Sequence, residues 1–321
     1  MRTLKPCHLE RRILPKPWGG TALQEILGLE VNAGANIGET WEVYDRPDGS
    51  SAIRGSGLSL RDLMERHAGE LLGEKAARQH KSFPLLIKFI DSREALSIQV
   101  HPDDHLAADD GDSGKSEAWI VLAAGPRARI IRGLRPGVSR EDLAAQLRSE
   151  GVVDLLQACR PVVGDVIPVP AGTVHSIGPD VVVFEVQQNS DITYRLFDWG
   201  RSRELQIDKG LRAVKVQADL TEPSRSPGQW GAGICWLLQE ERFRVRKVRL
   251  EESEGFDTEG SVKILSVLRG SGTLGWRSGT QELPIALGKG DTVLVPASVE
   301  KVFVSPIGGL EFFWTDPGAS G

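Results

Sequence analysis

Short apolar runs that end at glycine, proline or aspartate recur along the chain. Examples are ALSIQV (95–100), AWIVLA (118–123), DVVVFEVQ (180–187) and DTVLVP (291–296). Runs of this length, rich in β-branched residues and bounded by turn formers, are typical of short strands. Many such strands in succession predict a mainly β protein, built as a sandwich or barrel.

Two segments depart from this pattern and predict amphipathic helices. Residues 59–79 would begin at Ser59 as the N-cap, and residues 138–157 carry Ser139 and Asp142 at the spacing of a capping box. Their apolar positions recur with helical spacing, at Leu60, Leu63, Met64, Leu71 and Leu72 in the first segment and Leu143, Leu147, Leu155 and Leu156 in the second.

An internal repeat organises the chain. GDVIPVPAGTVH (164–175) and GDTVLVPASVEK (290–301) share a Gly-Asp start and a Pro-Ala pair, and each follows a strand that ends in glycine, at 117–125 and 262–270. The stretch from the strand-ending glycine to the Gly-Asp pair is longer in the first copy, by about the length of the helical segment 138–157. We therefore interpret the chain as two copies of one β unit, the first with a helical insertion.

The two copies differ at one position that matters for chemistry, since the first has His175 where the second has Lys301. Any metal site therefore belongs to the first copy. We expect a catalytic domain over residues 1–216, a Gly- and Pro-rich linker over 217–235, and a degenerate unit without metal ligands over 236–321.

Composition narrows the class of protein. The 321 residues are 40% hydrophobic and 26% charged with a net charge of −5, which argues against nucleic acid as a partner. No apolar run is long enough for a membrane span or a signal peptide. Cys7, Cys159 and Cys235 form no CxxC pair and predict free, buried thiols in a reducing cytoplasm. We expect a cytoplasmic monomer or homodimer that acts on a small molecule.

Four polar residues at strand ends form a candidate metal site. Gln99 and His101 lie two apart on one strand and share a face, Glu117 opens the next apolar run, and His175 follows a Pro-Gly turn. Zinc accepts imidazole nitrogen and carboxylate oxygen. A neutral glutamine and one glutamate would leave Zn²⁺ with net positive charge.

Each of these residues alone is more often a hydrogen-bonded core residue or a solvated strand end, and only the set favours a metal. Two rival functions stay open. His101, Glu117 and His175 would suffice for the facial triad of an Fe-dependent oxidoreductase, leaving Gln99 spare. A non-catalytic sugar-phosphate sensor could keep the same fold without turnover.

The motif around His175 resembles the second cupin motif at Gly164, Pro170, Gly172 and His175, although Pro179 replaces its usual asparagine. Further segments follow in order and closely resemble the type I mannose-6-phosphate isomerase (phosphomannose isomerase) family in its short bacterial form. They are PKPWGG (15–20), GETWEVYDRPDGSS (38–51), PLLIKFIDSREALSIQVHPDD (84–104), GKSEAW (114–119) and FEVQQNSDITYRLFDWGR (184–201).

The resemblance implies two cupin-type jelly-roll units and a zinc-dependent isomerase that interconverts mannose 6-phosphate and fructose 6-phosphate through an enediol. It assigns one Zn²⁺ per chain to Gln99, His101, Glu117 and His175.

The resemblance also places Lys115 and Arg195 in the active site. Lys88 and Glu185 are charges inside apolar runs and are further catalytic candidates, and Ser97 shares the face of Gln99 and is expected to contact substrate. The sequence leaves the identity of the base open. Trp41 and Trp119 are expected to pack in the core, and the glycines of WGG (18–20) are not interpreted as a phosphate loop.

Overall fold

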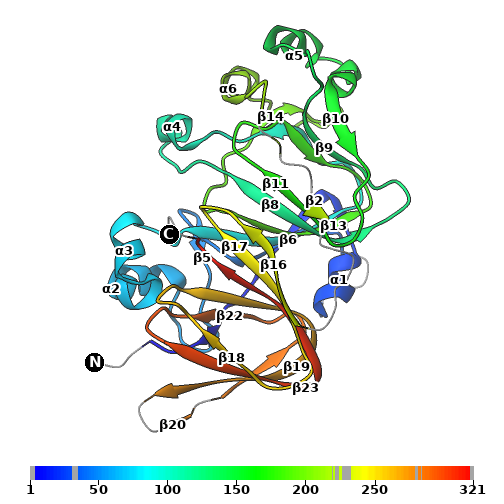
Figure 1. Cartoon of the computed structure of the whole chain (residues 1–321). Helices are drawn as coiled ribbons and strands as arrows, with labels where there is room; N and C mark the ends of the chain where they lie inside the picture. Colours follow the sequence, from blue (N-terminus) through cyan, green and yellow to red (C-terminus); the bar gives the residue numbers. More distant parts are fainter. Residues whose placement is uncertain are drawn as a thin grey trace.

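Three antiparallel sheets contain nearly all the strands of the computed structural model, so the predicted mainly β fold is confirmed (Figure 1). The structure describes residues 4–30, 35–218, 220, 224–225, 233–278, 281–282 and 284–318. None of the helices in these ranges is long and apolar enough to cross a membrane.

Two of the sheets lie in the N-terminal half. The seven-stranded sheet runs, in spatial order, β15 (Ser224–Arg225), β11 (Asp165–Val169), β8 (Glu117–Ala124), β13 (Val181–Gln188), β6 (Leu85–Ser92), β2 (Arg12–Gly20) and β3 (Ile37–Val43). The five-stranded sheet runs β10 (Leu156–Cys159), β9 (Ile130–Leu134), β12 (His175–Ile177), β7 (Ile98–Val100) and β14 (Tyr194–Phe197). Apolar residues of both sheets, such as Val121 and Ile177, share one buried cluster, so the two sheets pack against each other.

The third sheet belongs to the C-terminal half. It runs β1 (Cys7–His8), β22 (Thr292–Val295), β19 (Lys263–Ser278), β23 (Lys301–Asp316), β17 (Arg244–Leu250) and β16 (Gly233–Gln239), and β18 (Glu254–Asp257), β20 (Gln281–Glu282) and β21 (Ile285–Gly288) pair with its long strands. A small hairpin, β4 (Asp45–Arg46) and β5 (Gly49–Ser50), stands apart.

The helices lie at the edges of the sheets (Figure 1). They are α1 (Ala22–Leu27), α2 (Leu60–Leu72), α3 (Glu74–Gln79), α4 (Asp104–Ala107), α5 (Arg140–Gln146) and α6 (Ile207–Ala213), with 3₁₀ turns at Ala108–Asp110 and Glu150–Leu155. The predicted helix at 59–79 is confirmed as α2 and α3, with a break at Gly73. Its capping box joins Ser59 and Asp62, and the apolar positions named above are buried.

The second helix was predicted too long. Its capping box at Ser139 and Asp142 is present, but α5 ends at Gln146. Ser149 adopts an extended backbone, Gly151 disfavours helix, and the segment continues as a 3₁₀ turn. Leu156 then opens strand β10 and pairs with Leu134.

The repeat predicted from the sequence has a matching strand register. Val169 of β11 lies opposite Glu117 of β8, and Val295 of β22 lies opposite Lys263 of β19. Lys263 thus replaces the carboxylate and Lys301 replaces His175. Two lysines at these positions disfavour a divalent cation in the second unit.

The halves share a core. Phe184 of β13 and Phe313 of β23 have ring centroids 4.6 Å apart within one buried cluster. Strand β1, from the start of the chain, pairs with β22 of the C-terminal sheet. Most of the predicted linker 217–235 lies outside the described residues, although β16 already begins at Gly233. The division into domains stays a prediction.

The cysteines differ from expectation in one respect. As predicted, the three cysteines form no disulfide within the described residues, but Cys159 and Cys235 are exposed rather than buried. Each lies on an edge strand among the strands that the structure describes, β10 or β16.

Candidate metal centre and active-site cavity

Three ligand-type side chains meet between the two sheets of the N-terminal half. The nearer oxygens of Glu117 lie 3.4 Å from Nε2 of His101 and 3.3 Å from Nε2 of His175, and all three residues are buried. Glu117 and His175 are the first residues of β8 and β12, and His101 directly follows β7. The ends of three strands from two sheets therefore converge on one point.

A backbone carbonyl orients each imidazole. Nδ1 of His101 lies 2.8 Å from the carbonyl oxygen of Ile192, and Nδ1 of His175 lies 2.9 Å from that of Thr173. Since a carbonyl only accepts, each Nδ1 carries the proton and each Nε2 presents a lone pair. Burial lowers the pKa of both imidazoles, that of His101 to about 3 with a further contribution from Lys115, so both rings are neutral at pH 7.

Gly172 makes the turn that positions His175. Its φ of +92° is the left-handed conformation that glycine adopts without strain, and its amide donates to the carbonyl of His101 over 2.8 Å. A Cβ at this position would lie 2.6 Å from Cγ of Lys215. The turn thus connects the backbones at the two candidate histidine ligands.

The surroundings of Glu117 show whether a cation fits between these three side chains. Both of its carboxylate oxygens are buried and accept no hydrogen bond from the described residues. Burial raises its pKa, but Lys115 and His101 outweigh that effect and hold the pKa well below its usual range. A buried, ionised carboxylate facing two imidazole lone pairs is the donor set that a divalent cation satisfies.

Gln99 lies beside this cluster. It is opposite His175 in the sheet, its Nε2 is 3.2 Å from Nε2 of His175, and its Oε1 accepts from Ser97 Oγ over 2.9 Å. With the side-chain amide turned over, Oε1 would face the cluster and the NH₂ group would donate to Ser97. The position thus suits a fourth, neutral ligand.

The ammonium group of Lys115 also lies at the cluster of His101, Glu117 and His175. Its ammonium lies 3.1 Å from Nε2 of His101 and 3.4 Å from Glu117, and the side chain is buried. The sequence placed it on the face of Glu117, and the structure brings the two together.

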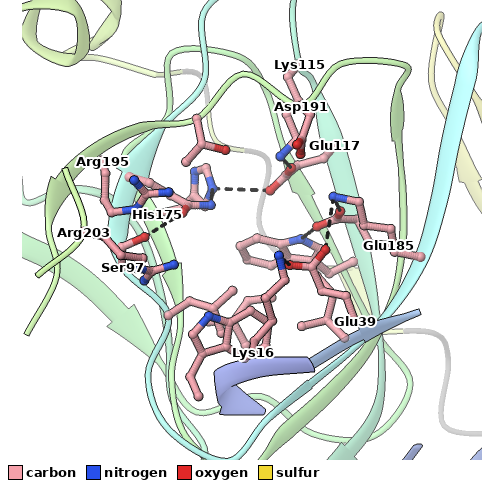
Figure 2. A pocket seen from close by; sticks show the side chains of 18 of the residues that line it. Lys16, Glu39, Ser97, Lys115, Glu117, His175, Glu185, Asp191, Arg195 and Arg203 are labelled. Carbon is pink, nitrogen blue, oxygen red and sulfur yellow. Dashed lines mark hydrogen bonds and ion pairs between the residues drawn. The ribbon is translucent and has the colours of Figure 1, made fainter. Parts of the chain in front are cut away.

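A cavity of about 300 Å³ opens onto the cluster. Glu185 and Lys88 line its wall, joined at 3.5 Å, and Glu39 lies 3.8 Å from Lys88 and 3.2 Å from Lys16. Trp119 Nε1 donates to Glu185 over 2.9 Å. Four alternating charges from β2, β3, β6 and β13 therefore form a continuous network at this wall (Figure 2).

The charges of this network shift the pKa values of its own members. Burial and the charge of Glu117 raise the pKa of Glu185 to about 7, against the opposing effect of Lys88. Burial would lower the pKa of Lys88, but Glu185 and Glu39 raise it above its ordinary value. Burial would raise the pKa of Glu39, but Lys88 and Lys16 lower it to about 2. Glu185 is thus the carboxyl group of this network that exchanges a proton near neutral pH.

Arg195 and Arg203 line the cavity on the side away from Glu185 (Figure 2). Arg195 pairs in register with Gln99, and its Nε is buried and donates no hydrogen bond within the described residues. Arg203 forms a two-pronged ion pair with Asp198 at 2.8 and 2.5 Å. Burial, with the repulsion of Arg203, lowers the pKa of Arg195. This side can receive an anionic group.

All the candidate metal ligands, catalytic residues and substrate contacts lie at this site, since His101 belongs to the buried cluster and the other eight line the cavity. Sequence patterns did not single out several other lining residues: Lys16, Glu39, Asp191, Thr193, Arg203 and Gln206. Trp41 and Trp119 are buried as predicted, but each also donates to a carboxylate, Trp41 to Glu39 over 2.7 Å. The indole N–H of a buried tryptophan usually donates to a polar partner, so the two tryptophans could have predicted nearby buried acceptors.

Comparison with known proteins gives consistent matches. The family described as phosphomannose isomerase type I, catalytic domain, matches residues 7–118. A mannose-6-phosphate isomerase of Streptococcus mutans is 32% identical over 311 residues, which cover 92% of this chain and 94% of the relative. A crystal structure of the mannose 6-phosphate isomerase from Bacillus subtilis superimposes with a TM-score of 0.84 at 31% identity, covering 97% and 99% of the two chains. A Salmonella typhimurium phosphomannose isomerase, 20% identical, has the same fold with a TM-score of 0.76 over 98% of this chain and all of the other.

Proposed function

The chain belongs to the type I phosphomannose isomerase family, and we propose that it interconverts D-mannose 6-phosphate and D-fructose 6-phosphate with one Zn²⁺ held by Gln99, His101, Glu117 and His175. The observation that carries the proposal is the buried cluster of His101, Glu117 and His175 on the wall of a cavity of sugar-phosphate size.

The donor set favours zinc. Two imidazole nitrogens and one carboxylate oxygen are typical zinc ligands, and an amide oxygen adds no charge. A divalent cation held by a single carboxylate keeps net positive charge. When bound, it would act as a Lewis acid toward the oxygens on C1 and C2 and stabilise the negative charge of the enediolate.

Glu185 is the residue best placed to move the proton between C1 and C2. A base with a pKa near 7 accepts a proton and returns it with similar ease at neutral pH. Lys88 holds one oxygen of Glu185 and Trp119 the other, which fixes the orientation of the carboxyl group. Lys115, beside the cluster, would donate to a substrate oxygen there.

The phosphate would bind at the opposite side. Arg195 has a buried Nε without a hydrogen-bond acceptor in the described part of the chain, and a guanidinium matches phosphate geometry. Ser97 lines the same cavity and donates to Gln99 over 2.9 Å, and it would contact the sugar. Binding the phosphate away from Glu185 would place the reacting carbons beside the base.

The proposal is tested by following mannose 6-phosphate conversion in a coupled assay, with purified protein as isolated, after chelation, and after addition of Zn²⁺. Activity should disappear with chelator and return with zinc. Glu185→Gln should lower kcat by at least about a hundredfold, whereas Glu65→Gln, on the exposed face of α2, should leave it unchanged. No turnover with one zinc bound would contradict the proposal, and oxygen uptake with Fe²⁺ would favour the oxidoreductase.

A further inference from the structure

A second cavity lies between the two halves of the chain, away from the candidate active site. Its volume is about 690 Å³, more than twice that of the active-site cavity. One wall comes from α1, from Leu122 of β8 and from Val163. The floor comes from β17, β19 and β23 of the C-terminal sheet, and Figure 1 shows α1 at the junction of the two halves. We refer to it as the junction crevice.

The junction crevice is positively charged. Its lining includes four cations, Lys247, Arg249, Arg269 and Lys289, and two carboxylates, Glu25 and Glu311. The whole chain, in contrast, has a net charge of −5. The excess of cations is therefore a local feature of this crevice.

The strand register concentrates these cations around one carboxylate. Glu311 of β23 is directly opposite Arg249 of β17 on one side and Arg269 of β19 on the other. It also lies 3.2 Å from the ammonium of Lys247, whose side chain is only 3% exposed. Among these groups Glu311 faces three cations, and Arg249 has a second carboxylate partner, Glu251 at 3.4 Å, so one positive charge is left over and a bound anion would offset it.

Two of the cations are available to such an anion. Arg269 and Lys289 are exposed and form no ion pair within the described residues, and Arg249 pairs only with the exposed Glu251 at 3.4 Å. Both arginines can donate two parallel hydrogen bonds to a phosphate group.

The rest of the lining is apolar. Leu268 is buried, Ile26 and Leu122 are half-buried, and Val163 is 56% exposed at the mouth. Burial of a flat apolar group against these side chains would stabilise a ligand by the hydrophobic effect. Inorganic phosphate would leave this surface uncovered.

We propose that the junction crevice binds a nucleotide, with its phosphates on Arg249, Arg269 and Lys289 and its base against Ile26, Leu122 and Leu268. The volume, the excess positive charge and the apolar wall all match an anion with a planar apolar body. The site is distinct from the isomerase cavity and does not depend on the proposed reaction.

Isothermal titration calorimetry of the full chain with ATP, pyrophosphate and adenosine tests the proposal. ATP should bind more tightly than either part. The double variant Arg269→Ala and Lys289→Ala should weaken ATP by at least about tenfold, because two charge-assisted contacts are lost. The control Arg66→Ala with Lys301→Ala removes an equal charge from exposed positions outside the crevice and should leave ATP binding unchanged.

Arg195→Ala locates the binding, because ATP held in the isomerase cavity would be weakened by that variant and ATP in the crevice would not. Three results would overturn the proposal. They are pyrophosphate binding as tightly as ATP, equal weakening in the crevice and control variants, and an ATP affinity that only Arg195→Ala reduces.

Discussion

Replacement of Lys88 by methionine tests the charge network at the cavity wall. The ammonium of Lys88 lies 3.5 Å from Glu185 and 3.8 Å from Glu39, and the side chain is only 4% exposed. Methionine fills a similar volume without the charge. Glu39 keeps Lys16 at 3.2 Å, so Glu185 is the carboxyl group that loses most.

The expected magnitude follows from the distance. Two unit charges 3.5 Å apart interact by about 5 kcal/mol at an effective dielectric constant of about 20. Losing this attraction moves the pKa of Glu185 well above its value of about 7. Folded wild type binds this proton more tightly than the unfolded chain, so the contribution of Glu185 to stability falls as pH rises from roughly 4.5 to 7 and then levels off.

In the variant that fall continues above pH 7. The gap in the free energy of unfolding between wild type and Lys88→Met should therefore widen by about 1.4 kcal/mol per pH unit from pH 7 to 9. The pKa of Lys88 itself is raised, so its own titration affects stability only above about pH 10.

Urea unfolding with chelator present, followed at pH 6, 7, 8 and 9, measures this gap. Wild type, Lys88→Met, Glu185→Gln and the double variant complete the cycle. In the Glu185→Gln background, Lys88→Met should show no extra dependence on pH. A gap that stays constant from pH 6 to 9 would refute the coupling of Lys88 to Glu185.

Three further changes have equally specific outcomes. Glu117→Gln removes the single carboxylate of the proposed metal site and should weaken metal binding by at least about a hundredfold in competition with a chromogenic chelator. Unchanged affinity would exclude Glu117 as a ligand. Trp41→Phe keeps a ring beside Lys88, 5.0 Å from its ammonium, but removes the 2.7 Å hydrogen bond to Glu39, so kcat should fall roughly three- to tenfold with little change in KM; a change in KM alone would contradict this. Ser59→Ala removes the cap of α2 and should destabilise the protein by about 1 kcal/mol in urea unfolding without changing kcat, and an unchanged unfolding midpoint would argue against the cap.

The glycines of the WGG segment (18–20) make close contacts that a local sequence motif does not predict. The sequence excluded a phosphate loop but offered no other reason for the glycines. In the structure a Cβ on Gly20 would lie 2.4 Å from Asp91, which accepts from the backbone N–H of Ala22 over 2.6 Å. Asp91 lies on β6, 71 residues after Gly20, so the spacing of residues near Gly20 cannot predict this contact.

The length of the second helix was overestimated for a related reason. Leu155 and Leu156 have helical spacing with Leu143 and Leu147, yet Leu156 pairs with Leu134 in a sheet. A leucine is equally suited to a buried helix face and a buried strand, and the strand that is available as a partner decides between them.

The sequence alone determined whatever depends on neighbours along the chain. Alternation along a strand predicts that Gln99 shares a face with Ser97, and capping boxes predict where two helices begin. The motif from Gly164 to His175 predicts the turn that precedes the imidazole. The tertiary structure decided which distant strands lie side by side. It brought Lys16, Glu39, Lys88 and Glu185 into one network and Arg249, Glu311 and Arg269 into one row. Such contacts depend on cross-strand register and on the packing of whole sheets, which local patterns do not encode.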